Sequence, residues 1–254
     1  MNEPSSYDCH DYRMLIRRWR ALVATTELCM KKFTILDGFP CYEVSTSGLS
    51  ESDQVVYLSA GIHGDEPASC EGLLRWAEGN LSMLNNLSFL LYPCLNPWGL
   101  ENNSRLDASG TDLNRAWHIS DHELIGPILQ KTRDLKLDLV LTLHEDYEGQ
   151  GIYLYEPSKG GRPNGNALRI LDSASGVIPH DPRKIIDGRT ARNGVIRPRP
   201  SSFPPEGIPE ALHFFNRHGC PSLTLETPSE YDFFRRAKAQ HLMIQECIQL
   251  HTVC

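Results

Sequence analysis

The sequence predicts an α/β fold with a mainly parallel sheet that is covered by helices on both faces. Short apolar runs alternate with segments of helical spacing, and this alternation is typical of the class. Three of the apolar runs lead directly into His or Glu. The chain has 254 residues, a length at which α/β folds often form one domain. We therefore expect a single domain over 1–254, with an N-terminal helix and hairpin in 1–50 packed on it.

The predicted elements follow the spacing of apolar residues and turn formers along the chain. The expected helices are 11–31, 67–76, 121–133, 166–174, 209–217 and 231–249. The expected strands are 33–36, 42–46, 54–60, 88–93, 138–143, 151–156 and 221–225. Asp37-Gly38 suits the turn of a hairpin between the first two strands.

The corner after the strand at 54–60 carries the first candidate site. His63 and Glu66 stand three residues apart there, and Pro67 suits the first turn of the following helix. Zinc in catalytic sites takes three protein ligands from His and carboxylate and leaves one position for water. Two such residues alone are weak evidence for a metal site, so a zinc site requires a third ligand elsewhere in the chain.

Two later apolar runs supply further candidates. The run at 138–143 delivers His144, and the run at 221–225 delivers Glu226. Sites in open α/β sheets lie outside the carboxyl ends of the strands, so His63 and His144 occupy equivalent positions on two strands. A carboxylate directly after a buried strand is costly unless it is paired or functional. The alternative for this set is a structural salt bridge at Glu226 and a core role for His144.

The segment 96–117 is rich in turn formers, which predicts a loop. It carries Arg105, Asn114 and Arg115, and a guanidinium binds a carboxylate in fork geometry. The ordered motifs of the chain are Gly-x-His-Gly-Asp-Glu, Asn-Pro-x-Gly, Arg, Gly-x-Asp-Leu-Asn-Arg-x-Trp, and then His and Glu at two strand ends. This order resembles the zinc carboxypeptidase family, whose superfamily includes the succinylglutamate desuccinylase and aspartoacylase branch. The resemblance spans about residues 55–226.

The resemblance implies a zinc carboxypeptidase-like α/β/α sandwich with a mixed sheet. It also implies that His63, Glu66 and His144 hold one zinc ion, and that Glu226 is the general base. Such a carboxylate can move a proton at neutral pH, because bound Zn²⁺ lowers the pKa of its water towards ~7. Acidic residues that follow His144 could add a second metal or, more often, orient the ligands: Glu145, Asp146 and Glu148.

The same resemblance implies a substrate with a free carboxylate. Arg105 would polarise the scissile carbonyl, while Asn114 and Arg115 would bind the terminal carboxylate. We expect a carboxypeptidase-like metallopeptidase that cleaves an amide bond next to that carboxylate. The alternatives are an N-acyl amino acid amidohydrolase of the desuccinylase/aspartoacylase type and a binding protein that keeps the zinc cleft without turnover.

Two features depart from the family pattern. Many members place a tyrosine upstream of the base, but no Tyr lies between Tyr155 and Tyr231, although Phe203 could shape the pocket there. Asp65 stands where digestive members carry a substrate-binding arginine. Both features favour the acyl amino acid alternative, whereas Trp117 and the Asn-Pro-x-Gly motif favour the peptidase.

The stretch 178–208 is dense in Pro, Gly and Arg, so we expect a long loop before the base-bearing strand. It would roof the cleft, with Arg189, Arg192 or Arg197 favouring acidic substrates. A plain surface loop is the alternative.

Composition favours a single soluble, cytoplasmic enzyme domain, whereas the resemblance implies that its substrate is a small peptide or acyl amino acid. The formal charge of -7 gives no broad attraction to nucleic acid or acidic membranes. No stretch is apolar for long enough to span a bilayer, and residues 1–6 lack the features of a signal peptide. The eight cysteines form no Cys-x-x-Cys pair, which indicates reduced thiols. The oligomeric state stays open.

Overall fold

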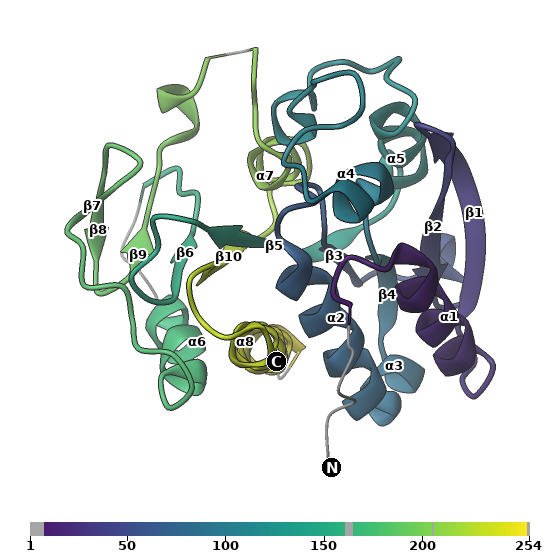
Figure 1. The fold of residues 1–254 in the computed structure, drawn as a ribbon, viewed down its shortest axis with the longest axis horizontal. Helices are drawn as coiled ribbons and strands as arrows, with labels where there is room; N and C mark the ends of the chain where they lie inside the picture. The colour runs from purple at the N-terminus through teal and green to yellow at the C-terminus, as the bar shows by residue number, and fades with distance from the viewer. Residues whose placement is uncertain (1–7, 161–164, 205, 253–254) are drawn as a thin grey trace.

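Ten strands form one mixed sheet in the part of the chain that the structure, a computed structural model, describes: residues 8–160, 165–204 and 206–252 (Figure 1). The strand order is β1-β2-β4-β3-β5-β10-β6-β9-β8-β7. The strands are β1 Cys29–Leu36, β2 Phe39–Ser45, β3 Val55–Ser59, β4 Ser88–Tyr92, β5 Leu137–Asp146, β6 Tyr153–Tyr155, β7 Ile185–Ile186, β8 Arg189–Arg192, β9 Val195–Ile196 and β10 Ser222–Pro228. The helices are α1 Tyr12–Val23, α2 Pro67–Gly79, α3 Leu81–Asn86, α4 Pro97–Asn102, α5 Ile125–Thr132, α6 Asn166–Ala174, α7 Glu210–His218 and α8 Phe233–Thr252.

The centre of the sheet is parallel. β4, β3, β5 and β10 run side by side in one direction, while β2 and β6 flank them in the opposite direction. Parallel strands buried on both faces are continuous apolar runs, and every residue of β3 is buried. Their carboxyl ends meet at one edge, where Glu226 lies directly opposite His144. The predicted mixed, mainly parallel α/β/α fold is confirmed.

Helices cover both faces of the sheet, as Figure 1 shows. Successive residues of a strand point to opposite faces, so Val56 and Leu58 join one core while Val55 and Tyr57 join the other. The first core is shared with α1, α2, α6 and α8, and the second with α5 and α7. The ends of the central strands are thereby held rigidly between two packed layers.

The predicted helix at 11–31 is wrong beyond Val23. Asp11 caps α1, since its side chain accepts a hydrogen bond from the N–H of Met14 at 2.7 Å. Strand β1 already begins at Cys29 and forms the predicted hairpin with β2 through Asp37-Gly38. The pairing of β1 with β2 overrides the helical spacing in these residues.

Two predicted loops contain regular structure. Within 96–117, Asn96 caps the short helix α4 by accepting from the N–H of Gly99 at 2.9 Å. Within 178–208, the strands β7, β8 and β9 form two tight hairpins. Their turns are Asp187-Gly188 and Asn193-Gly194, and all four residues have positive φ. Asp-Gly and Asn-Gly between two strands are the strongest local hairpin signals in a sequence. The expectation of a structureless loop there is therefore wrong.

Other expectations meet the structure only in part. None of the described helices is both long and apolar enough to cross a membrane. Seven cysteines lie in the described residues and all are unpaired, whereas Cys254 and residues 1–6 lie outside them. The single domain over 1–254 stays a prediction.

Candidate metal centre and its cleft

The corner that carries His63 and Glu66 is shaped by close backbone packing. A Cβ atom on Gly64 would lie 1.9 Å from the carbonyl carbon of Gly99, so only glycine fits. The N–H of Gly64 donates to the carbonyl of Ser104 at 2.9 Å. The Gly-x-His-Gly and Asn-Pro-x-Gly motifs are thus in contact, and this contact brings the arginine that follows Ser104 to the corner.

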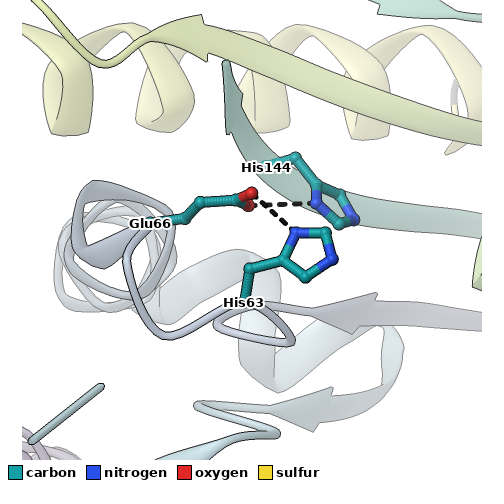
Figure 2. A group of neighbouring side chains, drawn as sticks. All are labelled: His63, Glu66 and His144. Atoms are coloured by element: carbon teal, nitrogen blue, oxygen red, sulfur yellow. Dashed lines mark hydrogen bonds and ion pairs between the residues drawn. The ribbon is translucent and has the colours of Figure 1, made fainter. Parts of the chain in front are cut away.

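His63, Glu66 and His144 come together as the sequence predicts. Their candidate ligand atoms all lie within 4.8 Å of one another. Nδ1 of His63 is 2.6 Å from Oε1 of Glu66, and Nδ1 of His144 is 3.0 Å from Oε2 (Figure 2). All three side chains are buried, with residue exposures of 2–3%. The loop after β3, the residue before α2 and the end of β5 supply one ligand each.

This donor set fits a zinc ion. Two imidazole nitrogens and one carboxylate are the ligands of a catalytic zinc site with an open fourth position. The described residues contain one such group of His, Cys, Asp and Glu, so the second-metal alternative for Glu145, Asp146 and Glu148 has no support there. The ligand roles themselves stay a prediction.

Without a metal, burial and the carboxylate of Glu66 act in opposite directions on the pKa of each ring. Burial disfavours charge on His63, but Glu66 and Asp112 outweigh it and raise the pKa of His63 to about 9. Burial dominates at His144, and its pKa is lowered despite the contact with Glu66. Burial opposes ionisation of Glu66, yet the two imidazoles hold its pKa below the ordinary value. Metal binding at neutral pH must therefore displace a proton from His63.

Asp112, which was not among the predicted site residues, belongs to this centre. Its Oδ1 lies 3.2 Å from Nε2 of His63, and its Oδ2 accepts from Arg105 at 3.1 Å. A carboxylate can only accept, so Asp112 favours the tautomer with a proton on Nε2 and leaves Nδ1 for a metal. The sequence feature that could have indicated this role is the position of Asp112 in the motif Gly-x-Asp-Leu-Asn-Arg.

Arg105 lies at the metal side of the cleft. Its Nη1 is 3.2 Å from Nδ1 of His63 and 3.6 Å from Oε1 of Glu66. Burial opposes its charge, but Asp112 and Glu66 raise the pKa of Arg105 above the ordinary value. A fixed positive charge therefore stands beside the position that a metal would occupy.

Asn114 and Arg115 line the same cavity. Oδ1 of Asn114 accepts from the N–H of Glu210 at 2.9 Å, which leaves the Nδ2 donors for another partner. Nη1 of Arg115 donates to the carbonyl of Asn114 at 3.1 Å. Their side chains therefore offer further donors to an anionic group.

Glu226 also lines the cavity and is 8% exposed. Burial raises the pKa of Glu226 well above its ordinary value, and the negative charges of Glu66, Asp146 and Asp187 add to the effect, while Arg105 opposes it. No salt bridge involving this carboxylate is found among the described residues, which argues against the structural alternative.

A family model described as the succinylglutamate desuccinylase/aspartoacylase catalytic domain matches residues 52–158. A candidate metallopeptidase from Shewanella denitrificans OS217 is similar in structure, with 21% identity, a TM-score of 0.84 and 99% of each chain covered. No curated protein matches the sequence. The comparisons support the zinc carboxypeptidase-like superfamily.

Two other solved structures share the fold of this chain. A metallo-carboxypeptidase from Burkholderia cenocepacia has 15% identity and a TM-score of 0.72 over 95% of this chain and 69% of its own. Carboxypeptidase A from Helicoverpa armigera has 13% identity and a TM-score of 0.67 over 99% of this chain and 76% of its own. Likeness at such identities concerns the fold alone.

Four aromatic rings line the cavity that contains the His-Glu-His group. The cavity holds about 710 Å³ and is lined by Tyr147, Tyr153, Tyr155 and Phe203. The hydroxyl of Tyr153 donates to Asp146 at 3.0 Å, and that of Tyr155 donates to Asp187 at 2.5 Å. Phe203 shapes the pocket as expected. Tyr147 directly follows β5, and Tyr153 and Tyr155 belong to β6, so all three precede the segment where the family pattern places its tyrosine.

Of the three arginines proposed to favour acidic substrates, Arg189 alone lines the cavity. It lies over the ring of Phe203, with 4.1 Å between Cζ and the ring centroid, and donates to Ser202 at 2.8 Å. Arg192 is exposed on the same strand, and Arg197 pairs with Glu156 at 2.6 Å. The role in substrate preference stays a proposal and is assigned to Arg189, because Arg192 and Arg197 do not belong to the cavity lining.

Proposed function

We propose that the chain is a zinc-dependent hydrolase that cleaves an amide bond next to a free carboxylate, as a carboxypeptidase-like metallopeptidase. The observation that carries this proposal is that one cavity brings together a buried His-Glu-His group and the carboxylate of Glu226. The same cavity is lined by three side chains that can donate hydrogen bonds: Arg105, Asn114 and Arg115. A binding protein needs neither a base nor an oxyanion donor. The geometry therefore favours an enzyme over a non-catalytic zinc cleft.

A zinc ion held by His63, Glu66 and His144 would supply Lewis-acid chemistry and a water acidic enough to react at neutral pH. Glu226 takes a proton from the attacking water and later returns it to the leaving amine. For this role Glu226 must be ionised. Arg105 opposes the rise in the pKa of Glu226, and a divalent cation at the neighbouring ligands would lower this pKa further.

Arg105 holds the carbonyl oxygen as negative charge develops on it during attack. Its guanidinium lies beside the ligands in a partly buried position, where a preorganised donor is worth more than in water. Asn114 and Arg115 bind the free carboxylate of the substrate through Nδ2 and the guanidinium. Together these groups fix the scissile bond between the metal side and the carboxylate side of the cavity.

The second candidate is an N-acyl amino acid amidohydrolase. The observation that favours it is the match of residues 52–158 to the desuccinylase/aspartoacylase model, a stretch that contains all three candidate ligands. Both candidates require a free carboxylate on the leaving amino acid. They differ in the group on the other side of the amide bond.

A substrate panel tests the proposal. The zinc-loaded protein would be given N-blocked dipeptides with varied C-terminal residues, N-acetyl and N-succinyl amino acids, and the C-terminal amide of each peptide. We expect cleavage of free-carboxylate peptides, loss of cleavage on chelation with recovery on zinc addition, and rates at least about 10²-fold lower on the amides. Equal cleavage of the amides, or no cleavage of any compound by zinc-loaded protein, contradicts the proposal. Faster cleavage of acyl amino acids selects the second candidate.

A further inference from the structure

Glu145 joins two of the elements that carry the candidate ligands. It follows His144 at the end of β5 and is 4% exposed. Its N–H donates to Oε2 of Glu66 at 3.1 Å, and its own Oε1 accepts from the N–H of Ala68 at 2.6 Å. Two hydrogen bonds of opposite direction therefore hold the end of β5 against the first turn of α2.

Helix α8 supports this link from behind. Nη1 of Arg236 donates to Oε2 of Glu145, and the arginine side chain is 12% exposed. A buried carboxylate without an ionic partner is strongly destabilising, so Arg236 is the group that stabilises the carboxylate of Glu145 in this position. One turn further along the same helix, Nε2 of Gln240 donates to the carbonyl of His144 at 2.8 Å.

The contacts of Glu145 separate it from the ligands. One of its carboxylate oxygens accepts from Ala68 and the other from Arg236, so neither oxygen faces the metal position unpaired. Glu145 is also not a member of the His-Glu-His group. A carboxylate that accepts from the first turn of α2 would stabilise that helix whether or not a metal is bound. The direct contact of its N–H with Glu66 is what extends its influence to the metal position.

We propose that Glu145, held in place by Arg236, is a positioning residue that fixes the separation of Glu66 and His144 and thereby sets the affinity of the centre for zinc. This role rests on the proposed zinc function. Contacts outside the ligand set commonly change metal affinity by about 10–100-fold.

The variant Arg236→Met tests the positioning role, because a charge effect and a positioning effect predict different changes in the affinity for zinc. Removal of a positive charge near a cation site should, through charge alone, leave zinc binding unchanged or make it tighter. If Arg236 instead holds Glu145 in place, zinc binding becomes weaker by about 10–100-fold. The measurement is the zinc Kd by competition with a chromophoric chelator, together with the absorption spectrum of the Co²⁺-substituted protein. Lys238→Met, an exposed position on the same helix, is the matched control.

We expect a weaker Kd and an altered Co²⁺ spectrum for Arg236→Met, recovery in Arg236→Lys, and no change in Lys238→Met. Arg236→Gln takes the place of Arg236→Met if the latter does not fold. A folded variant with wild-type or tighter zinc binding overturns the positioning role alone. Failure of the wild-type chain to bind zinc overturns the proposed function and this role together.

Discussion

The two walls of the cavity are built in different ways. The metal-side wall lies at the ends of parallel strands, and its three candidate ligands are almost fully buried with partners from several elements. The second wall includes Asp187 and Arg189 from the antiparallel hairpin of β7 and β8, where Asp187 is exposed and Arg189 is half-buried. Chemistry requires fixed geometry, whereas recognition of different substrates tolerates variation in surface segments. We infer that the first wall carries catalysis and the second carries selectivity.

The largest expected effect is on the catalytic wall. Glu226→Gln keeps the size of the side chain but cannot accept a proton, so kcat/KM should fall by about 10²–10⁴-fold. The zinc Kd should stay at the wild-type value, because Glu226 lies outside the ligand group. Steady-state kinetics with zinc titration measures both quantities. Unchanged turnover would place the base elsewhere.

Arg105→Met should be the next largest loss, about 10²–10³-fold in kcat, because one preorganised oxyanion donor is removed. KM should change much less, since Arg105 acts on charge that develops in the transition state. Arg133→Met, an exposed position after α5, is the control and should leave both constants unchanged. A loss confined to KM would assign Arg105 to ground-state binding instead.

Two arginines of strand β8 test the selectivity wall. Arg189→Ala should reduce the preference for a substrate with an acidic group over a neutral isostere by about tenfold, the value of one charged hydrogen bond. Arg192→Ala should leave that preference unchanged, because Arg192 is exposed and does not belong to the cavity lining. The ratio of kcat/KM for paired substrates is the readout. Equal behaviour of the two variants would remove Arg189 from substrate recognition.

The smallest expected effect is that of the negative charge of Asp187, in the second wall, on the pKa of Glu226. The negative charge of Asp187 contributes to the raised pKa of Glu226. A base works only when ionised, so activity is lost as the pH falls through this raised pKa. Asp187→Asn removes a negative neighbour, lowers the pKa of Glu226, and should move the acidic limb of the kcat/KM profile to lower pH. A limb that stays in place, or moves to higher pH, would show that Asp187 does not act on the base.

The same contrast explains what could be predicted from the sequence. Apolar runs followed by His144 and Glu226 predicted buried parallel strands and residues at their shared edge, because period and burial are local signals. Asp112 received no role, and Glu145 was expected only in general terms to orient the ligands, because the partners that define their positions, His63 and Arg236, lie 49 and 91 residues away.

The selectivity wall was predicted poorly for a different reason. The density of Pro and Arg in 178–208 obscured the Asp-Gly and Asn-Gly turns that define its hairpins. The helix expected at 11–31 failed similarly, since pairing between β1 and β2 overrides local spacing. In both regions the strands are short or lie at the edge of the sheet, so their burial pattern is weak.

The central claim is that His63, Glu66 and His144 hold one metal ion. The most direct test is zinc content and zinc Kd of the purified chain beside His63→Ala and His144→Ala, with the exposed His118→Ala as control. The account predicts one zinc per chain in the wild type and in His118→Ala, and loss of tight binding in the other two variants. A wild-type chain without zinc, or stoichiometric tight binding in both ligand variants, would contradict it.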